Sequence, residues 1–333
     1  MPSGTPQVVV ITGASAGVGR ATVRAFAREG AHIGLLARGV DGLEAARREV
    51  EQAGGEALVL PTDVSQADRV EAAAEQVEAR FGPIDVWVNN AMTSVFSPVK
   101  EMTAAEFERV TDVTYLGVVY GTLAALKRML PRNRGTIVQV GSALAKRSIP
   151  LQAAYCGAKH AIAGFTESLR CELLHDKSDV HVTMVHLPAM NTPQFGWVKS
   201  RLPRHPQPVP PIYQPEVAAE AIVWASRHGH KKELYVGTPT VKAAMGQKVI
   251  APLLDRYLAS VGYSGQQTDG IDPHDRPTDL WAPVPGDHGA HGSFDDRSRR
   301  FSIQTWASMN RYSLAVGAAC LAGLFAGAAL LRR

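Results

Sequence analysis

The chain has 333 residues, 45% of them hydrophobic and 20% charged, so it can form one large globular domain with an additional segment. The net charge of +4 is small and the basic residues are scattered, which argues against a nucleic-acid-binding protein. Three cysteines without a CxxC pair argue against a disulfide framework, and the linker histidines have no spacing typical of a metal site. The residues before position 8 are few and polar, so we expect no secretory signal peptide.

Short β-branched runs alternate with longer amphipathic stretches from residue 7 to about residue 237. Near-continuous apolar strands that alternate with helices predict an α/β fold, a doubly wound Rossmann-type parallel sheet of seven strands with helices on both faces. The predicted elements, in chain order, are strand 8–11, helix 17–28, strand 32–37, helix 41–53, strand 57–60, helix 65–80, strand 84–88, helix 103–129, strand 136–140, helix 152–174, strand 180–186, helix 215–227 and strand 233–236.

The composition changes after this core. The stretch after residue 262 is rich in Gly, Pro, Asp, Gln and His, whereas 314–331 is an uncharged apolar run. As a helix this run would be about 27 Å long, close to the ~30 Å hydrocarbon core of a bilayer, and the alternative is an apolar helix that packs on protein. We expect a cytoplasmic catalytic domain at 1–261 (core 7–240, extra helices 241–259), a flexible linker at 262–311 and a transmembrane anchor at 312–333.

A glycine-rich loop lies between the first predicted strand and the first predicted helix, with the sequence Thr-Gly-Ala-Ser-Ala-Gly-Val-Gly at 12–19. Glycines allow a tight turn and let backbone N–H groups approach a pyrophosphate, which the positive end of the helix dipole also favours. A glycine-rich turn alone is a weak signal, but its place directly between a strand and a helix predicts a dinucleotide site.

The end of the second strand indicates which dinucleotide binds. A carboxylate there would accept a hydrogen bond from the adenosine ribose of NAD, but this sequence has Ala37 followed by Arg38. An arginine can pair with the 2′-phosphate of NADP, although an arginine at a strand end can also be simply solvated. We therefore expect NADP(H), with NAD the less favoured cofactor.

Three residues form a candidate catalytic group. Ser142 ends the fifth predicted strand, and Tyr155 and Lys159 follow at positions i and i+4 of the next helix, on one helix face. The carboxyl ends of parallel strands point at the ligand crevice, so all three are expected to converge there. A nearby ammonium lowers the pKa of a phenol, and a serine hydroxyl can hydrogen-bond a substrate oxygen. Tyr155 is thus the expected proton donor and acceptor.

These motifs together resemble the short-chain dehydrogenase/reductase family, over roughly residues 7–240. The resemblance implies hydride transfer between a nicotinamide and a substrate carbon, and packing of the two long helices, 103–129 and 152–174, between the subunits of a homodimer or homotetramer. It also implies that Asp63 and Val64 contact the adenine and that Lys159 holds the nicotinamide ribose. With the glycine loop, the expected cofactor set is Gly13, Ser15, Gly17, Val18, Gly19, Arg38, Asp63, Val64, Asn90, Ala91, Tyr155, Lys159, Pro188 and Thr192.

Two positions depart from the family's pattern. Met92 stands where the family usually has Gly, and its bulk is expected to shape the substrate pocket. Thr114 stands where the family usually has an Asn that supports a proton relay to the lysine. Threonine serves if the relay uses the backbone carbonyl, whereas turnover falls if the Asn side chain is needed to hold a helix bulge.

The substrate is expected to be a small carbonyl or alcohol compound, and a lipophilic one if the chain is anchored in a membrane. Phe195 and Trp197 lie in a proline-rich stretch at 194–213, which either covers an apolar substrate together with Met92 or is a surface loop. Two other function classes stay open: a membrane-tethered NADP-binding scaffold or sensor with little turnover, and a non-redox epimerase or dehydratase on the same fold.

Overall fold

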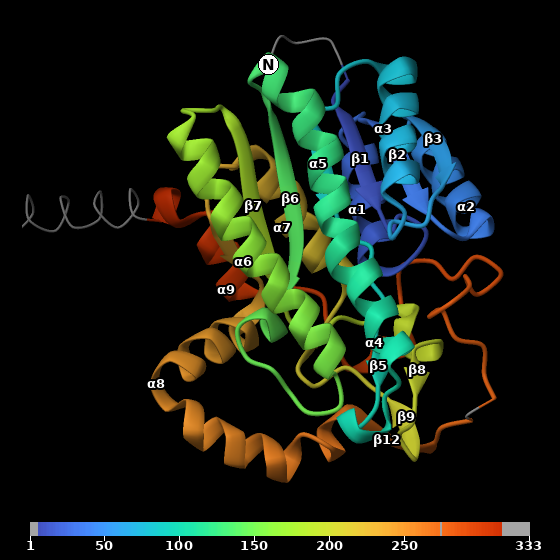
Figure 1. Cartoon of the computed structure of the whole chain (residues 1–333), viewed down its shortest axis with the longest axis vertical. Coiled ribbons are helices and arrows are strands. Elements are labelled where there is room, and N and C mark those ends of the chain that lie inside the picture. The colour runs from blue at the N-terminus through green and yellow to red at the C-terminus, as the bar shows by residue number, and fades with distance from the viewer. Residues whose placement is uncertain (1–5, 274, 315–333) are drawn as a thin grey trace, which may run out of the picture.

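The computed structural model describes residues 6–273 and 275–314, and seven parallel strands form its central sheet (Figure 1). Their spatial order is β11-β7-β6-β4-β1-β2-β3, so the chain reverses direction across the sheet between β1 and β4. The predicted doubly wound seven-stranded sheet is confirmed. The strands are β1 (Val8–Thr12), β2 (His32–Ala37), β3 (Glu56–Pro61), β4 (Val86–Asn89), β6 (Gly135–Ser142), β7 (Val180–Leu187) and β11 (Glu233–Tyr235).

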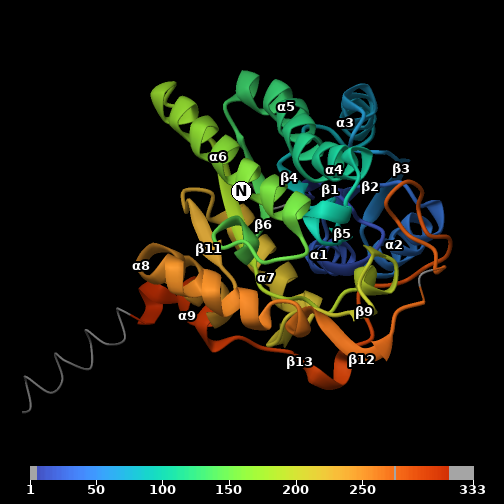
Figure 2. The same ribbon diagram turned by 60° about the horizontal axis from the view of Figure 1, so that its bottom comes forward.

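Helices cover both faces of this sheet (Figure 2). One face packs on α1 (Gly17–Ala27), α2 (Val40–Gln52) and α7 (Pro215–Arg227). The other packs on α3 (Ala67–Phe81), α5 (Gly117–Met129) and α6 (Ala153–His175). The strands are apolar on both faces because both faces are buried, which is why the sequence showed continuous rather than alternating apolar runs.

The helix predicted at 103–129 is interrupted in the structure. It consists of α4 (Ala104–Thr111), a π-helical turn (Asp112–Leu116) and α5. Thr103 caps α4 in a reciprocal capping box with Glu106. Hydrophobic periodicity does not distinguish a π-helical turn from the α-helix around it, so the sequence alone predicted one continuous helix.

The C-terminal third adds α8 (Gly237–Val261), which is kinked at Ile250 just before Pro252, and α9 (Ile303–Met309). Short strands add three small pairs at the carboxyl edge of the main sheet, and two of them include residues from 262–311. The pairs are β5 (Val95–Phe96) with β8 (Lys199–Ser200), β9 (Arg204–Pro206) with β12 (Gln267–Ile271), and β10 (Ile212–Tyr213) with β13 (Ser298–Arg299).

The segment 262–311 therefore differs from the flexible linker that its composition predicts. Its residues 279–294, which we call the closing segment, run beside α2 in orange and red in Figure 1. Three apolar side chains fix it: Leu280 is fully buried, and Ala290 and Phe294 nearly so. The composition predicted a flexible linker because most residues of this stretch are polar. A few buried apolar residues are nevertheless sufficient to pack such a segment on the domain.

The expected anchor at 312–333 lies almost entirely outside the described residues, which end at residue 314. Within 6–273 and 275–314, no helix has the length and apolar character needed to cross a membrane.

We expect that Leu280→Ala lowers the free energy of unfolding by about 2 to 5 kcal/mol, because it leaves a cavity among Val95, Val110 and Ala154. Denaturant titration measures this change. Ile271→Ala is the matched control, since Ile271 is 84% exposed and its truncation should change stability by less than about 0.5 kcal/mol. Equal effects of the two substitutions would mean that the closing segment is not docked.

Candidate active site

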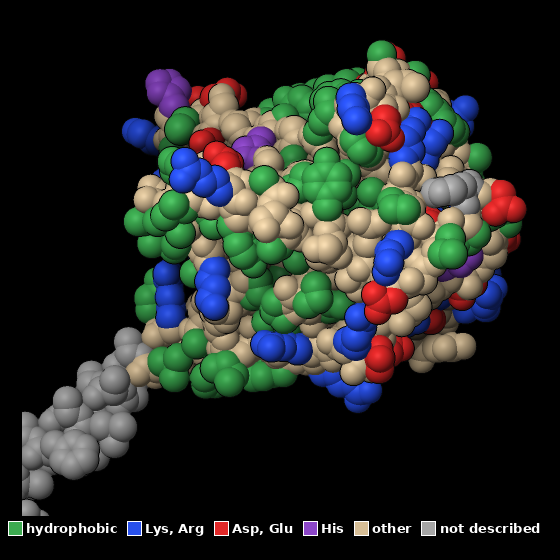
Figure 3. Space-filling view, turned by 90° about the horizontal axis from the view of Figure 1, so that it is seen from below, with side chains coloured by type: hydrophobic (Ala, Val, Ile, Leu, Met, Phe, Trp, Pro, Cys, Tyr) green, Lys and Arg blue, Asp and Glu red, His purple; other side chains and the backbone are tan. Residues whose placement is uncertain are grey.

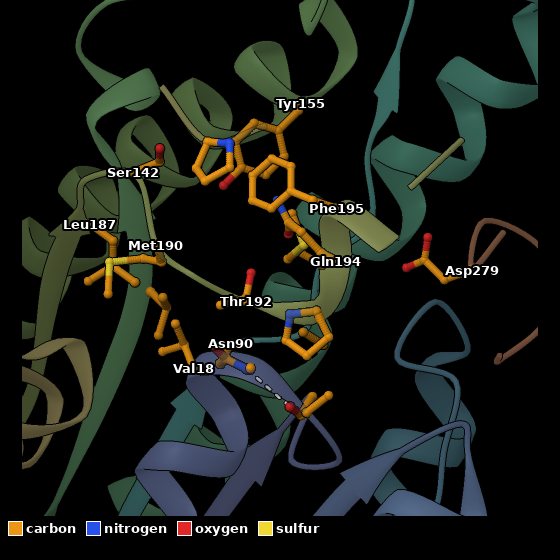
Figure 4. Close-up of a pocket in the computed structure, with 18 of the residues that line it drawn as sticks. Val18, Asn90, Ser142, Tyr155, Leu187, Met190, Thr192, Gln194, Phe195 and Asp279 are labelled. Carbon is orange, nitrogen blue, oxygen red and sulfur yellow. Dashed lines mark hydrogen bonds between the residues drawn. The ribbon is translucent and has the colours of Figure 1, made fainter. Parts of the chain in front are cut away.

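A cavity of about 450 Å³ lies at the carboxyl edge of the sheet, where the loops after the strands meet the closing segment. Almost all of the residues predicted to form the site line this one cavity. Figure 4 labels several of them, among them Asn90, Ser142 and Tyr155. Gly19 and Thr114 do not line the cavity. The predicted residues that do are Gly13, Ser15, Gly17, Val18, Arg38, Asp63, Val64, Asn90, Ala91, Met92, Ser142, Tyr155, Lys159, Pro188, Thr192, Phe195 and Trp197.

The glycine loop needs glycine for steric reasons at two positions. Gly13 has a φ of +67°, and a Cβ on Gly19 would lie 1.9 Å from the carbonyl oxygen of Gly13. This close approach lets α1 follow β1 after four residues, so that Gly17 and Val18 of its first turn line the cavity. The side chain of Asn90 braces the loop by donating to Thr12 O at 3.0 Å and to Gly13 O at 3.3 Å. The residues present therefore fit the pyrophosphate of a dinucleotide.

The candidate catalytic group is assembled at the other end of the cavity. Ser142 ends β6, while Tyr155 and Lys159 lie one turn apart on α6. The Lys159 ammonium lies 5.5 Å from the centre of the Tyr155 ring and donates to the carbonyl oxygen of Val140 at 2.7 Å. All three side chains line the cavity.

Burial sets the protonation of this group. It lowers the pKa of Lys159 to about 8, so the ammonium persists at neutral pH and is lost as the pH rises through that value. Burial also raises the pKa of Tyr155, and a hydrogen bond with Ser142 partly opposes this rise. Tyr155 is thus protonated at neutral pH, and its phenolate depends on a nearby positive charge.

A second layer fixes the strand end that carries Ser142. His186 of β7 is fully buried, with Nδ1 3.1 Å from the carbonyl oxygen of Ser142 and Nε2 2.9 Å from Glu233. Lys146 pairs with the same carboxylate at 2.6 Å. Burial alone would raise the pKa of Glu233, but hydrogen bonds from His186, Lys146 and Tyr235 outweigh it and hold that pKa well below its usual range.

Thr114 lies within the π-helical turn, so a helix bulge is present although the family's usual Asn is absent. The Thr114 hydroxyl donates to the carbonyl oxygen of Thr93 at 2.9 Å and accepts from its N–H at 3.0 Å. Thr114 therefore holds the chain that follows Met92, and its hydroxyl is engaged away from the cavity.

The end of the cavity where the adenosine is expected contains Arg38 and Asp63. Arg109 binds the Asp63 carboxylate at 2.6 Å. The Arg38 guanidinium donates to the backbone carbonyl oxygens of Asp279 and Leu280 in the closing segment. Two of the five N–H donors of the guanidinium are thereby directed at this backbone.

Sequence reasoning missed the wall that the closing segment supplies. Asp279, Pro283, Val284, Gly286 and His288 all line the cavity, although their stretch was predicted to be a linker. Burial raises the pKa of Asp279 to about 6, and the positive charge of Arg38 partly opposes this rise. The only sequence signal was the presence of isolated apolar residues in a polar stretch.

The substrate end of the cavity is apolar. Phe195 packs edge-to-face on Phe96 and Phe294, with ring centres 6.2 and 5.9 Å apart, and Trp197 packs on His288. Met92 lines the same cavity. The cavity wall includes further apolar residues that the sequence did not single out, among them Leu144, Ile149, Leu187, Met190 and Val209.

Comparison with known proteins agrees with this geometry. The profile of the short chain dehydrogenase family matches residues 7–201, well over half of the chain. The chain belongs to the short-chain dehydrogenase/reductase family. It is therefore an NAD(P)-binding oxidoreductase, as its glycine loop and its Ser142, Tyr155 and Lys159 group also indicate.

Two curated relatives and one solved structure are informative. The uncharacterized oxidoreductase YxnA of Bacillus subtilis is 34% identical over 98% of this chain and 91% of its own length. A fatty acyl-CoA reductase of Acinetobacter baylyi is 30% identical over 78% of this chain and 84% of its own length. The alcohol dehydrogenase of Thermococcus sibiricus, complexed with 5-hydroxy-NADP, superposes with a TM-score of 0.58 at 29% identity, over 69% of this chain and 95% of that one.

Proposed function

We propose that the protein is an NADP(H)-dependent oxidoreductase that interconverts a carbonyl and an alcohol on a lipophilic substrate. The observation that carries the proposal is that one cavity contains the glycine loop at one end and Ser142, Tyr155 and Lys159 at the other. A dinucleotide needs both ends, because its pyrophosphate and its nicotinamide lie far apart in one extended molecule.

The roles of the side chains follow from their chemistry. In the reducing direction the Tyr155 hydroxyl donates its proton to the substrate oxygen, and solvent later restores that proton. The Lys159 ammonium stabilises the phenolate left on Tyr155, and the Ser142 hydroxyl hydrogen-bonds the substrate oxygen as charge develops there. When bound, the nicotinamide supplies the hydride that the substrate carbon receives.

A lipophilic substrate is supported by the apolar wall and by a relative. Leu144, Met190 and Phe195 line the cavity beside the catalytic group. A protein 30% identical to this chain is named a fatty acyl-CoA reductase. We therefore place the substrate among long-chain carbonyl compounds, whose alkyl chains gain free energy from burial against these side chains.

We expect Tyr155→Phe to lower turnover of long-chain aldehydes by about 10² to 10⁴-fold, because it removes the proton donor but keeps the ring. The measurement is NADPH consumption and alcohol formation by the full chain, with short polar ketones as comparison substrates. Tyr120→Phe, on α5 and outside the cavity, is the matched control. NADPH that binds but is not consumed with any substrate would favour the scaffold function, and product without net NADPH consumption would favour an epimerase or dehydratase.

NADP(H) is preferred over NAD(H) in this proposal because Arg38, rather than a carboxylate, follows β2 and lines the cavity. We expect Arg38→Ala to weaken NADPH binding by about tenfold and NADH binding much less, since only NADPH has a 2′-phosphate. Fluorescence titration of both nucleotides measures this difference. The exposed Arg28→Ala is the control, and an equal loss for both nucleotides would remove Arg38 from phosphate recognition.

Membrane attachment through 312–333 is part of the same proposal. On α8, Val249, Leu253 and Tyr257 are each at least 60% exposed, and basic side chains lie between apolar ones on the face seen in Figure 3. This face adjoins α9, which precedes the apolar run 314–331.

We expect the full chain to float with phospholipid vesicles that contain anionic lipid. A chain ending at residue 311 should remain in the bottom fraction, because the deletion removes the apolar run. Flotation assays with both proteins check this. If both chains float equally, the attachment belongs to the folded domain rather than to the run.

A further inference from the structure

The closing segment is fixed along the outer edge of the dinucleotide groove. Gly286 N–H donates to the carboxylate of Asp41 at 2.8 Å, and Asp287 pairs with the buried Arg20 at 3.1 Å. The Gly17 N–H, at the start of α1, donates to the carbonyl oxygen of Gly289 at 3.0 Å. These contacts join the segment to α1 and α2, the two helices that begin at the groove, so it forms a wall of the nucleotide site.

Asp279 brings an acid to this wall beside Arg38. The Arg38 guanidinium donates to the backbone carbonyl of Asp279, and the Thr93 hydroxyl donates to Asp279 Oδ2 at 3.4 Å. The other carboxylate oxygen, Oδ1, is screened from solvent and has no hydrogen-bond partner among the described residues. In Figure 4 the Asp279 carboxyl group points toward the cavity, on the far side of Phe195 and Gln194 from Ser142.

A buried carboxylate oxygen without a partner is costly, and a ligand that donates a hydrogen bond would remove that cost. The adenosine ribose of NAD offers two such hydroxyl donors, whereas the ribose of NADP has a phosphate with about −1.5 to −2 charges in place of one of them. Arg109 is paired with Asp63 and donates to the Leu280 carbonyl oxygen, and its positive charge, like that of Arg38, lowers the pKa of Asp279.

Building on the proposed function, we infer that Asp279 is a specificity-determining residue of the dinucleotide site, where it opposes Arg38. Arg38 attracts the 2′-phosphate of NADP(H), while Asp279 repels it and accepts a hydrogen bond from the ribose hydroxyl of NAD(H). Arg38 directly follows β2, whereas Asp279 belongs to the closing segment. Both the core fold and the C-terminal segment therefore contribute to cofactor specificity. The intact chain thus discriminates less between the two dinucleotides than Arg38 alone would allow.

The test is the pair of dissociation constants for NADPH and NADH, measured by fluorescence titration or calorimetry without substrate. Asp279→Asn keeps the shape of the side chain but removes its charge, so NADPH should bind more tightly and NADH more weakly. We expect the ratio of the NADH to the NADPH dissociation constant to rise by about tenfold. Asp275→Asn is the matched control, because it removes the same charge from an exposed side chain just before the closing segment.

Two further variants make each outcome decisive. Asp279→Glu keeps the charge and should keep the wild-type ratio, and Asp279→Ser removes the charge again if the Asn variant does not fold. The inference is overturned if the ratio of the NADH to the NADPH dissociation constant changes less than twofold when the Asp279 charge is removed. It is also overturned if Asp275→Asn changes this ratio as much as Asp279→Asn does. Arg38→Ala reports on the proposed NADP(H) preference independently: a loss specific to NADPH in that variant leaves the proposed function standing even when Asp279 has no effect.

Discussion

The site depends on one buried charge, the ammonium of Lys159. An ammonium inside a protein must be hydrogen-bonded or it loses its proton, and here the carbonyl oxygen of Val140 accepts from it at 2.7 Å. This bond joins α6 to the end of β6 and so sets where Tyr155 lies relative to Ser142. The His186 and Glu233 pair fixes the same strand end from the other side. The relative positions of Ser142, Tyr155 and Lys159 thus follow from the hydrogen bond that the buried Lys159 ammonium makes.

The sequence predicted the parts of this arrangement that depend on local pattern. The sheet, the glycine loop and the Ser142, Tyr155 and Lys159 group follow from strand periodicity, turn chemistry and the i, i+4 spacing on one helix. It did not predict the π-helical turn around Thr114, because a bulge leaves the apolar pattern almost unchanged. Asp279 was missed because its role depends on contacts with residues such as Arg38 and Thr93 that are far away in the chain.

Arg38 illustrates how a side chain singled out from the sequence can have contacts that the sequence does not show. Its place after β2 was read from the sequence, but two of its donors are directed at carbonyl oxygens of the closing segment. The backbone at Asp279 and Leu280 therefore orients the Arg38 side chain. A nucleotide site of this kind is best described by both of its walls, since each restricts what the other can bind.

The docking of Leu280 against Val95, Val110 and Ala154 has a consequence for where the functional unit ends. A chain truncated at the last turn of α8 would keep Ser142, Tyr155 and Lys159. It would lack one wall of the nucleotide groove and leave a cavity where Leu280 packs. Expression designs, domain swaps and sequence-based trimming should therefore treat the chain through α9 as indivisible. Conversely, substitutions in the closing segment can alter the outer rim of the site without any change in the sheet or its glycine loop.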